Sequence, residues 1–311
     1  MYDVIIIGGG PGGIAAGVYA ARKKMKCALI AEALSGQSVA SEEIQNWICT
    51  IAISGYDLAL TLEKHLRAQT GIDIIDGERV GKIDKRADNT YLVTTQSGKT
   101  FETKTLLLTV GSRHKKLGVP GEKEAEGHGV VYCAICDAPL FKDKDVVVVG
   151  GGNSGLEAVV DLLPYAKKIY LLHRGDALKG DATTQEKIAK QKNVEIIFNA
   201  DTKEIIADEK KFVHGLVYKD KKTGDEKKLD VQGVFVEVGV QPNSEFVAHL
   251  VKLTPQNAIV VDPRTQKSSD SGIWAAGDVT DGLYRQNNVS AGDAIKALLN
   301  IYEELHVKNA Q

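Results

Sequence analysis

Residues 4–13 read VIIIGGGPGG, an apolar run that passes directly into a glycine-rich turn. A second copy of the pattern, VVVVGGGNSG, occupies residues 146–155. In each copy the apolar run predicts a strand, and the small residues after the glycines predict a helix. Glycines at such a turn let backbone N–H groups approach a pyrophosphate at the helix N-terminus, so each copy predicts a dinucleotide site. We call residues 8–13 the first fingerprint and residues 150–155 the second. Their candidate binding residues are Gly8, Gly10, Pro11, Gly12 and Gly13, and Gly150, Gly152, Asn153, Ser154 and Gly155.

The sequence after each fingerprint also repeats. A helix over residues 15–22 and a strand over 27–31 correspond to a helix over 156–163 and a strand over 169–172. Each copy then shows a hairpin-like stretch and a final apolar strand that ends in glycine. Alternating strands and helices of this kind predict an α/β protein with two Rossmann-like, doubly wound, mostly parallel sheets.

A third apolar strand, GIWAAGD at residues 272–278, has no fingerprint of its own. We therefore expect it to return to the first domain. The first domain is then discontinuous, with residues 1–114 and 246–311, and the second domain, residues 115–245, is inserted into it.

Composition excludes several classes of protein. The chain is 43% hydrophobic and 26% charged, with a net charge of −2, as in ordinary soluble globular proteins. It has no long basic run, which argues against nucleic acid or anionic lipid as partner. No apolar run reaches the roughly 18 residues that a membrane span needs. The opening MYD leads straight into a strand without the regions of a signal peptide, and four cysteines do not form a secreted framework. A reducing cytoplasm is the expected compartment.

A CxxC motif, Cys133 and Cys136, precedes the second fingerprint. Such a pair can be redox-active, half of a zinc site, or two buried thiols. Zinc would need further ligands, but Cys27 and Cys49 lie elsewhere, with no histidine at ligand spacing, so the redox interpretation is favoured. Dithiol chemistry needs a thiolate and a proton carrier. Asp137 directly follows the pair and could move that proton or merely cap the next turn.

The ends of the second strands suggest which dinucleotide each site takes. Glu32 lies 19 residues after Gly13, where a carboxylate binds the ribose hydroxyls, although a solvated loop glutamate is the alternative. The corresponding place in the second copy holds His173 and Arg174 and no carboxylate. A cationic pair there suits a 2′-phosphate and favours NADPH over NADH.

With these residues in hand, the chain resembles the low-molecular-weight thioredoxin reductases along essentially its whole length. The shared motifs are GGGPGG, TVG at 109–111, VYCAICD at 131–137, GGGNSG, GD at 277–278 and YRQ at 284–286. The resemblance implies FAD on the first domain, NADPH on the second, and a homodimer. The implied cofactor contacts beyond the fingerprints are Glu32, Gly36, Gln37, Asn46, Gly111, Gly277, Asp278, Arg285 and Gln286, with His173, Arg174 and Lys179 on the nicotinamide side.

The resemblance also implies a route for electrons. A hydride passes from NADPH to FAD, then two electrons pass to the Cys133–Cys136 disulfide, and the dithiol reduces thioredoxin or a thioredoxin-like protein. The two domains rotate relative to each other between these steps. Cys136 is the implied flavin-facing sulfur, and Asp137 is the implied proton donor.

Three stretches depart from the family pattern. Residues 173–179 read HRGDALK, so one arginine of the 2′-phosphate signature is missing and another is Lys179. Gly155 stands where NADPH-using members often have alanine, and QNWICT at 45–50 replaces a run near the flavin. The first two departures weaken the preference for NADPH without abolishing it, because Arg174 remains.

The same sequence motifs also occur in proteins with other functions. The flavoprotein component of alkyl hydroperoxide reductase shares much of the pattern, especially GGGNSG followed by Glu157 and Ala158. One alternative is therefore an NADH-dependent reductase of a peroxiredoxin system, or a small-molecule dithiol oxidoreductase. A second alternative is a ferredoxin-linked or redox-sensing flavoprotein, although an intact GGGNSG argues against ferredoxin as the donor.

Overall fold

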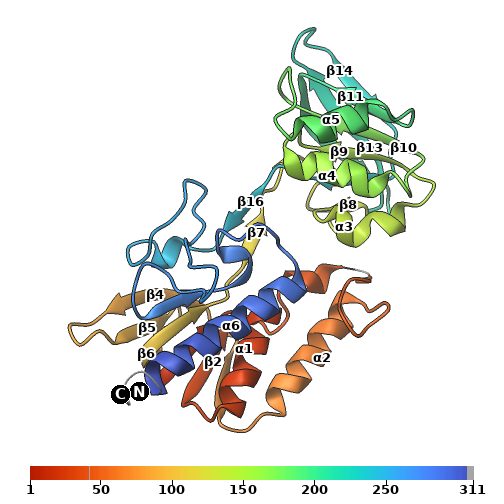
Figure 1. Ribbon diagram of the computed structural model, residues 1–311. Helices are drawn as coiled ribbons and strands as arrows, with labels where there is room; N and C mark the ends of the chain where they lie inside the picture. Colours follow the sequence, from red (N-terminus) through yellow and green to blue (C-terminus); the bar gives the residue numbers. More distant parts are fainter. Residues whose placement is uncertain (42, 307–311) are drawn as a thin grey trace. The chain divides into compact units, whose positions relative to one another are not determined.

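The computed structural model of the chain describes residues 1–41 and 43–306. These residues form two compact units (Figure 1). Of the described residues, unit 1 comprises Met1–Ala40, Trp47–Arg113 and 241–306, and unit 2 comprises Ser41, 43–46 and His114–Val240. The main crossings between units therefore lie at 113/114 and 240/241, where the sequence-based division placed them at 114/115 and 245/246. The two crossing segments, β7 (Ser112–His114) and β16 (Val240–Pro242), pair with each other.

Unit 1 is built on a seven-stranded sheet of order β3-β2-β1-β6-β5-β4, with β17 paired to β6. The pairs β1–β2, β2–β3, β1–β6 and β6–β17 are parallel, and β4–β5–β6 form an antiparallel meander. Its strands are β1 (Tyr2–Ile7), β2 (Cys27–Ala31), β3 (Ile72–Asp76), β4 (Val80–Lys85), β5 (Tyr91–Thr95), β6 (Thr100–Leu108) and β17 (Ile273–Ala275). Its α-helices are α1 (Pro11–Arg22), α2 (Gly55–Arg67) and α6 (Asn287–His306). Its short 3₁₀ helices, labelled η, are η1 (Gln37–Ala40), η3 (Glu245–Val247) and η4 (Gly277–Val279).

The apolar run of β1 is buried on both faces of this sheet. Val4 and Ile6 point into a core that α1, α2 and α6 complete, and α6 packs along α1 (Figure 1). Ile5 and Ile7 point into a second core on the opposite face. Because successive side chains of a strand alternate between faces, a continuous apolar run is the sequence of a strand buried on both sides.

Unit 2 has a five-stranded, all-parallel sheet of order β11-β10-β9-β15-β8. A three-stranded antiparallel sheet, β12-β13-β14, accompanies it. The strands are β8 (Val130–Val131), β9 (Asp145–Val149), β10 (Lys168–Leu172), β11 (Val194–Ile197), β12 (Ala200–Ala207), β13 (Val213–Asp220), β14 (Glu226–Leu229) and β15 (Gly233–Val236). The helices are α3 (Ala134–Asp137), η2 (Ala138–Phe141), α4 (Asn153–Leu162) and α5 (Ala182–Ala189).

The two faces of the unit 2 sheet have different covers. Val146 and Val148 of β9 pack with side chains of α4 and α5. Val147 and Val149 pack instead with the antiparallel sheet, through residues such as Leu216. The alternation along β9 therefore matches that along β1, as the sequence repeat predicts.

The structure confirms the predicted fold class and most of the predicted elements. The late strand, β17, joins unit 1 by pairing with β6, as expected. The predicted hairpin turns have the backbone they need, with positive φ at Asn89, Gly98 and Gly224. The helices after the fingerprints begin earlier than their small-residue runs suggested, at Pro11 and Asn153. Proline suits the first helical position because its ring fixes φ and no N–H is needed there.

Candidate functional site

The first fingerprint turn requires glycine at both ends. Gly8 directly follows β1 with φ +119°, and an added Cβ would lie 2.4 Å from the Thr109 carbonyl oxygen. A Cβ on Gly13 would lie 1.9 Å from the carbonyl oxygen of Gly8. Thr109 holds the same turn from the end of strand β6, because its hydroxyl donates to the carbonyl oxygen of Ile7 at 3.0 Å. Close helix–strand packing is the known role of the third glycine.

The second fingerprint repeats this geometry. Gly150 has φ +139°, and its Cβ would lie 2.2 Å from the carbonyl oxygen of Glu237. A Cβ on Gly155 would lie 1.9 Å from the carbonyl oxygen of Gly150, the same distance as in the first copy. The sequence repeat is therefore a repeat of backbone geometry.

The middle glycine of each turn is open. The nearest atom to a Cβ on Gly10 would be the Gly36 Cα at 3.6 Å, and a Cβ on Gly152 would meet nothing within 4 Å. These two glycines are also the N-caps of α1 and α4, and neither helix has a side-chain cap among the described residues. By contrast, Ser54 caps α2 and Asp181 caps α5. Open space and uncapped N–H groups at a helix N-terminus fit a pyrophosphate.

Several predicted flavin residues gather at the first turn. Gly36, with φ +68°, lies so close that its Cβ would be 3.0 Å from the Gly10 Cα. Gln37 follows, and its side-chain amide donates to the carbonyl oxygen of Ser112. The same amide would be 3.7 Å from a Cβ on Gly111, which has φ +63°.

Helix α6 reaches the first fingerprint as well, since a Cβ on Gly12 would lie 3.0 Å from the backbone carbonyl oxygen of Ser290. The hydroxyl of Ser290 lies 2.7 Å from the Cβ position of Gly277 and donates to Asp278 at 3.4 Å. Burial raises the pKa of Asp278, while the positive charge of Arg285 opposes that rise. Arg285 is exposed and Gln286 is half-buried. Ser290 thus lies against both Gly12 of the first fingerprint and the Gly277–Asp278 pair.

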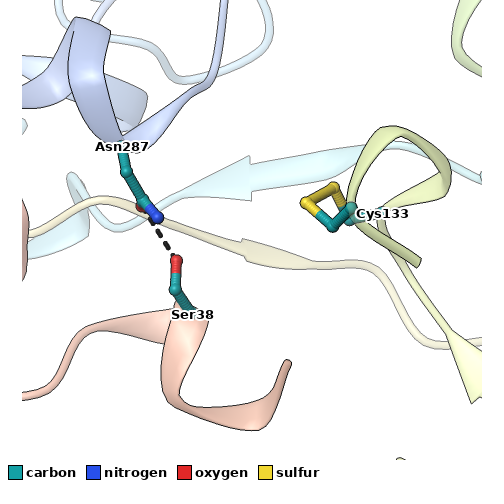
Figure 2. Close-up of a disulfide and its surroundings, with 4 residues drawn as sticks. Ser38, Cys133 and Asn287 are labelled. Atoms are coloured by element: carbon teal, nitrogen blue, oxygen red, sulfur yellow. Dashed lines mark hydrogen bonds between the residues drawn. A yellow bond between two sulfur atoms is a disulfide. The ribbon is translucent and has the colours of Figure 1, made fainter. Parts of the chain in front are cut away.

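Ser38 of η1 and Asn287 at the start of α6 form a further contact that sequence analysis missed. The Ser38 hydroxyl donates to Asn287 Oδ1 at 2.8 Å (Figure 2). Neither residue belongs to a motif that would single it out, so this contact is visible only in the folded chain.

Glu32 and Asn46 have different settings. Glu32 follows β2 with its side chain 69% exposed and is 3.6 Å from the Arg79 guanidinium, so its carboxylate is accessible to a ligand. Asn46 is exposed and belongs to the Ser41–Asn46 segment of unit 2.

The surroundings of the second fingerprint carry fewer positive charges than the sequence suggested. His173 is buried, its Nε2 has no hydrogen-bond partner among the described residues, and burial lowers its pKa. At neutral pH this imidazole is therefore uncharged. Arg174 and Lys179 are exposed and supply the positive charge, while Asn153 Oδ1 accepts a 2.8 Å hydrogen bond from the Asp181 amide.

Lys221 is a further cation at this place. Its ammonium donates to the carbonyl oxygen of Arg174 at 3.2 Å, from the turn after β13. The two residues are 47 positions apart in the chain, and no motif links them. Sequence reasoning could not have found this contact.

The cysteine pair forms a disulfide at the start of α3 (Figure 2). The Cα atoms of Cys133 and Cys136 are 5.3 Å apart, within the usual range for a disulfide. Both cysteines are half-buried. The carbonyl oxygen of Cys133 accepts from the amides of Cys136 and Asp137, and the Asp137 side chain is buried.

Glu237 is a second residue of unit 2 that sequence reasoning missed. Its carboxylate accepts a hydrogen bond from the backbone N–H of Ala134, between the two cysteines. Burial raises the pKa of Glu237 to about 8. A signal was present, because Glu237 directly precedes Val-Gly, as Thr109 does in the first copy.

A family model described as pyridine nucleotide-disulphide oxidoreductase matches residues 2–294. The chain belongs to this family. A thioredoxin reductase from Streptococcus pyogenes has a similar structure, with a TM-score of 0.88, 34% identity and 98% of both chains covered. A thioredoxin reductase from Giardia duodenalis has a TM-score of 0.87 at 31% identity, also over 98% of both chains.

Curated relatives carry other names. The F subunit of alkyl hydroperoxide reductase from Pseudomonas aeruginosa is 41% identical over 98% of this chain and 58% of its own length. A protein named NADH dehydrogenase from Bacillus subtilis is 38% identical over the same shares. The chain thus spans somewhat more than half of these curated relatives.

Membership of the family makes the protein an oxidoreductase and a flavoprotein, and it implies FAD and a pyridine nucleotide as cofactors. The two open turns fit two dinucleotides. Within residues 1–41 and 43–306, no helix is long and apolar enough to cross a bilayer.

Proposed function

We propose that this protein reduces the disulfide of thioredoxin or a thioredoxin-like protein with electrons from a pyridine nucleotide. One observation carries the proposal: the disulfide lies at the start of α3 in the unit that also holds the second open fingerprint. In this assignment the turn of unit 1 binds FAD, with Gly8–Gly13, Glu32, Gln37 and Asp278 as contacts. The turn of unit 2 binds the nicotinamide cofactor.

When bound, the cofactors supply hydride transfer from nicotinamide to flavin and a source of two electrons for the disulfide. Cys133 and Cys136 take up those two electrons and two protons as the S–S bond breaks. Asp137 is placed to deliver one proton, since it is buried and directly follows Cys136. One thiolate then attacks the partner disulfide, and the second thiol resolves the mixed disulfide, so two electrons and two protons leave with the partner.

NADPH is the proposed donor. Arg174 and Lys179 are exposed at the end of β10, where an adenosine 2′-phosphate would lie, and Lys221 adds a third cation beside Arg174. Arginine and lysine both bind phosphate, although only arginine offers a planar, bidentate fork.

A second candidate is an NADH-dependent reductase of a peroxiredoxin system. The 41% identity to the F subunit of alkyl hydroperoxide reductase supports it. The uncharged His173 also supports it, because a weaker positive field discriminates less against NADH.

Anaerobic kinetics separate these functions. We would follow flavin bleaching with NADPH and NADH, and then turnover with a purified thioredoxin and a purified oxidised peroxiredoxin. Thioredoxin reduction driven by NADPH is the expected result. Preference for NADH together with peroxiredoxin would favour the second candidate. Bleaching by neither nucleotide would refute the nicotinamide step and leave a ferredoxin-linked or redox-sensing role.

We further propose that the protein acts as a homodimer in the cytoplasm. Light scattering of the purified full-length protein tests the first statement, and cell fractionation tests the second.

A further inference from the structure

Glu237 contacts both the second fingerprint and the segment that carries the disulfide. It directly follows β15, and its own Cβ is 3.4 Å from where a Cβ on Gly150 would lie, at the second fingerprint. Its carboxylate accepts the backbone N–H of Ala134, the residue after Cys133. One acidic side chain therefore lies between the dinucleotide turn and the redox-active disulfide, and the mechanism above gives it no task.

The groups that face Glu237 favour its neutral form. Burial raises the pKa of Glu237, and the negative charges of Asp161 and Glu157 on α4 raise it further, to about 8. The pKa of Asp161 is itself raised, mainly by burial. Opposing them is the Ala134 amide of α3, which favours the carboxylate. No cation of the described residues acts on this carboxyl, so near pH 7 it holds a proton.

Reduction of the disulfide changes the charge beside this acid. Breaking the S–S bond with two electrons and one proton gives a thiol and a thiolate. A thiolate at Cys133 or Cys136 and an ionised Glu237 would be like charges near each other, because Glu237 accepts from the amide of Ala134, the residue after Cys133. Like charges disfavour each other's ionisation, so each would hold its proton to a higher pH in the presence of the other.

We propose that Glu237 is a positioning residue that couples its own proton to the redox state of Cys133 and Cys136. The inference rests on the proposed dithiol function and deepens it. While Glu237 is protonated, no negative charge on its carboxyl repels the thiolate, and the disulfide is readily reduced. Once Glu237 ionises, the thiolate is disfavoured and the disulfide is harder to reduce.

The test is the equilibrium between disulfide and dithiol in the purified full-length protein, poised with dithiothreitol and quantified by alkylation and mass spectrometry across pH. Glu237→Gln keeps the shape and the acceptor for the Ala134 amide but cannot ionise. We expect wild type and Glu237→Gln to agree near pH 6.5. Above about pH 8 the variant should be reduced more readily, by roughly tenfold, the effect of one nearby like charge.

Two further variants make the result specific. Glu209→Gln removes an exposed acid of the same unit and should follow the wild type at every pH. Glu237→Asp retains a titrating acid and should retain a pH break, displaced from that of the wild type. Coincident curves for wild type and Glu237→Gln above pH 8 would overturn the inference.

A measurement on the wild type guards against a variant that fails to fold. The infrared difference between dithiol and disulfide forms near pH 8 should contain the carbonyl band of a carboxylic acid that gains a proton on reduction. Absence of that band would also overturn the inference. Neither result depends on a nucleotide or a partner protein. Failure of the proposed function would therefore be seen separately, because dithiothreitol would reduce the disulfide while NADPH and NADH would not.

Discussion

Gly155 packs against Gly150 so closely that a Cβ on Gly155 would lie 1.9 Å from the Gly150 carbonyl oxygen. Between them in the chain, a Cβ on Gly152 would meet nothing within 4 Å. Gly155 and Gly152 of one fingerprint therefore have separable roles. Gly155 allows the helix to approach the strand, and Gly152 keeps space open for a ligand.

Alanine at these positions should separate folding from binding. Gly155→Ala forces the turn to shift and should lower the free energy of unfolding by about 1–3 kcal/mol. Gly152→Ala should leave stability within about 0.5 kcal/mol, yet weaken pyridine nucleotide binding because its methyl group occupies the pyrophosphate space. Urea unfolding and nucleotide titration check both. Equal nucleotide affinity in Gly152→Ala and wild type would contradict the assignment.

Loss of either redox cysteine should block only the last half of the reaction. Cys133→Ser and Cys136→Ser should retain flavin bleaching by the pyridine nucleotide and lose reduction of the protein disulfide down to background. The exposed Cys49 provides the control, and Cys49→Ser should turn over normally. Anaerobic bleaching and steady-state assays measure the two halves. Full turnover in either redox variant would refute the scheme.

Arg174 should carry most of the discrimination between NADPH and NADH. Arg174→Ala should raise the KM for NADPH by about tenfold, the effect of losing one charged hydrogen bond, and leave the KM for NADH nearly unchanged. Lys221→Ala should act in the same direction but more weakly, because lysine lacks the planar fork. Lys190→Ala, beyond the end of α5, is the control. Equal changes for both nucleotides would argue against a 2′-phosphate site.

Glu32 should contribute to FAD binding but not to the stability of the apoprotein. Its ion pair with Arg79 is exposed, and such pairs contribute little. Glu32→Ala should therefore leave the stability of the apoprotein unchanged and weaken FAD binding by about tenfold, through loss of the ribose contact. Flavin retained after dialysis gives the measurement, and Glu303→Ala on α6 gives the control. Unchanged flavin retention would show that Glu32 is only a solvated loop residue.

The raised pKa of Glu237 also predicts how stability depends on pH. A carboxyl whose pKa rises on folding binds its proton more tightly in the native state. Its contribution to stability is therefore fully present below the unfolded pKa and lost as pH rises to about 8. Urea unfolding between about pH 4.5 and pH 9 should show this loss, at most about 5 kcal/mol, in wild type and Glu209→Gln but not in Glu237→Gln. Parallel curves for all three proteins would contradict the assignment.

Short-range patterns predicted the fold well because they act locally. The apolar runs at residues 4–7 and 146–149 are buried on both faces, as strands without polar alternation must be. The first and last glycines of each fingerprint are required by backbone contacts at the same turn. The redox pair was also readable, since two cysteines three residues apart on one helical turn can meet without help from the rest of the chain.

The charge and the burial of residues near the second fingerprint were harder to predict from the sequence. His173 was taken as part of a cationic pair, but the two loops that carry Gly151 and Gly175 pack against its ring, and burial leaves it uncharged at neutral pH. Lys221 reaches Arg174 through the segment before β12, because its N–H donates to the carbonyl oxygen of Asn199, whose own N–H donates to that of Gly175. A single sequence carries no record of such burial or of contacts between distant segments.

The sequence by itself determined the two dinucleotide turns, the parallel sheets around them and the disulfide pair, because each follows from patterns within a few residues. Tertiary structure decided the rest. It brought Ser290, which donates to Asp278, against Gly12 of the first fingerprint, and it placed Glu237 against the amide between the cysteines. Side chains far apart in the chain acquire their charge state and partners only when packing removes water and brings them together.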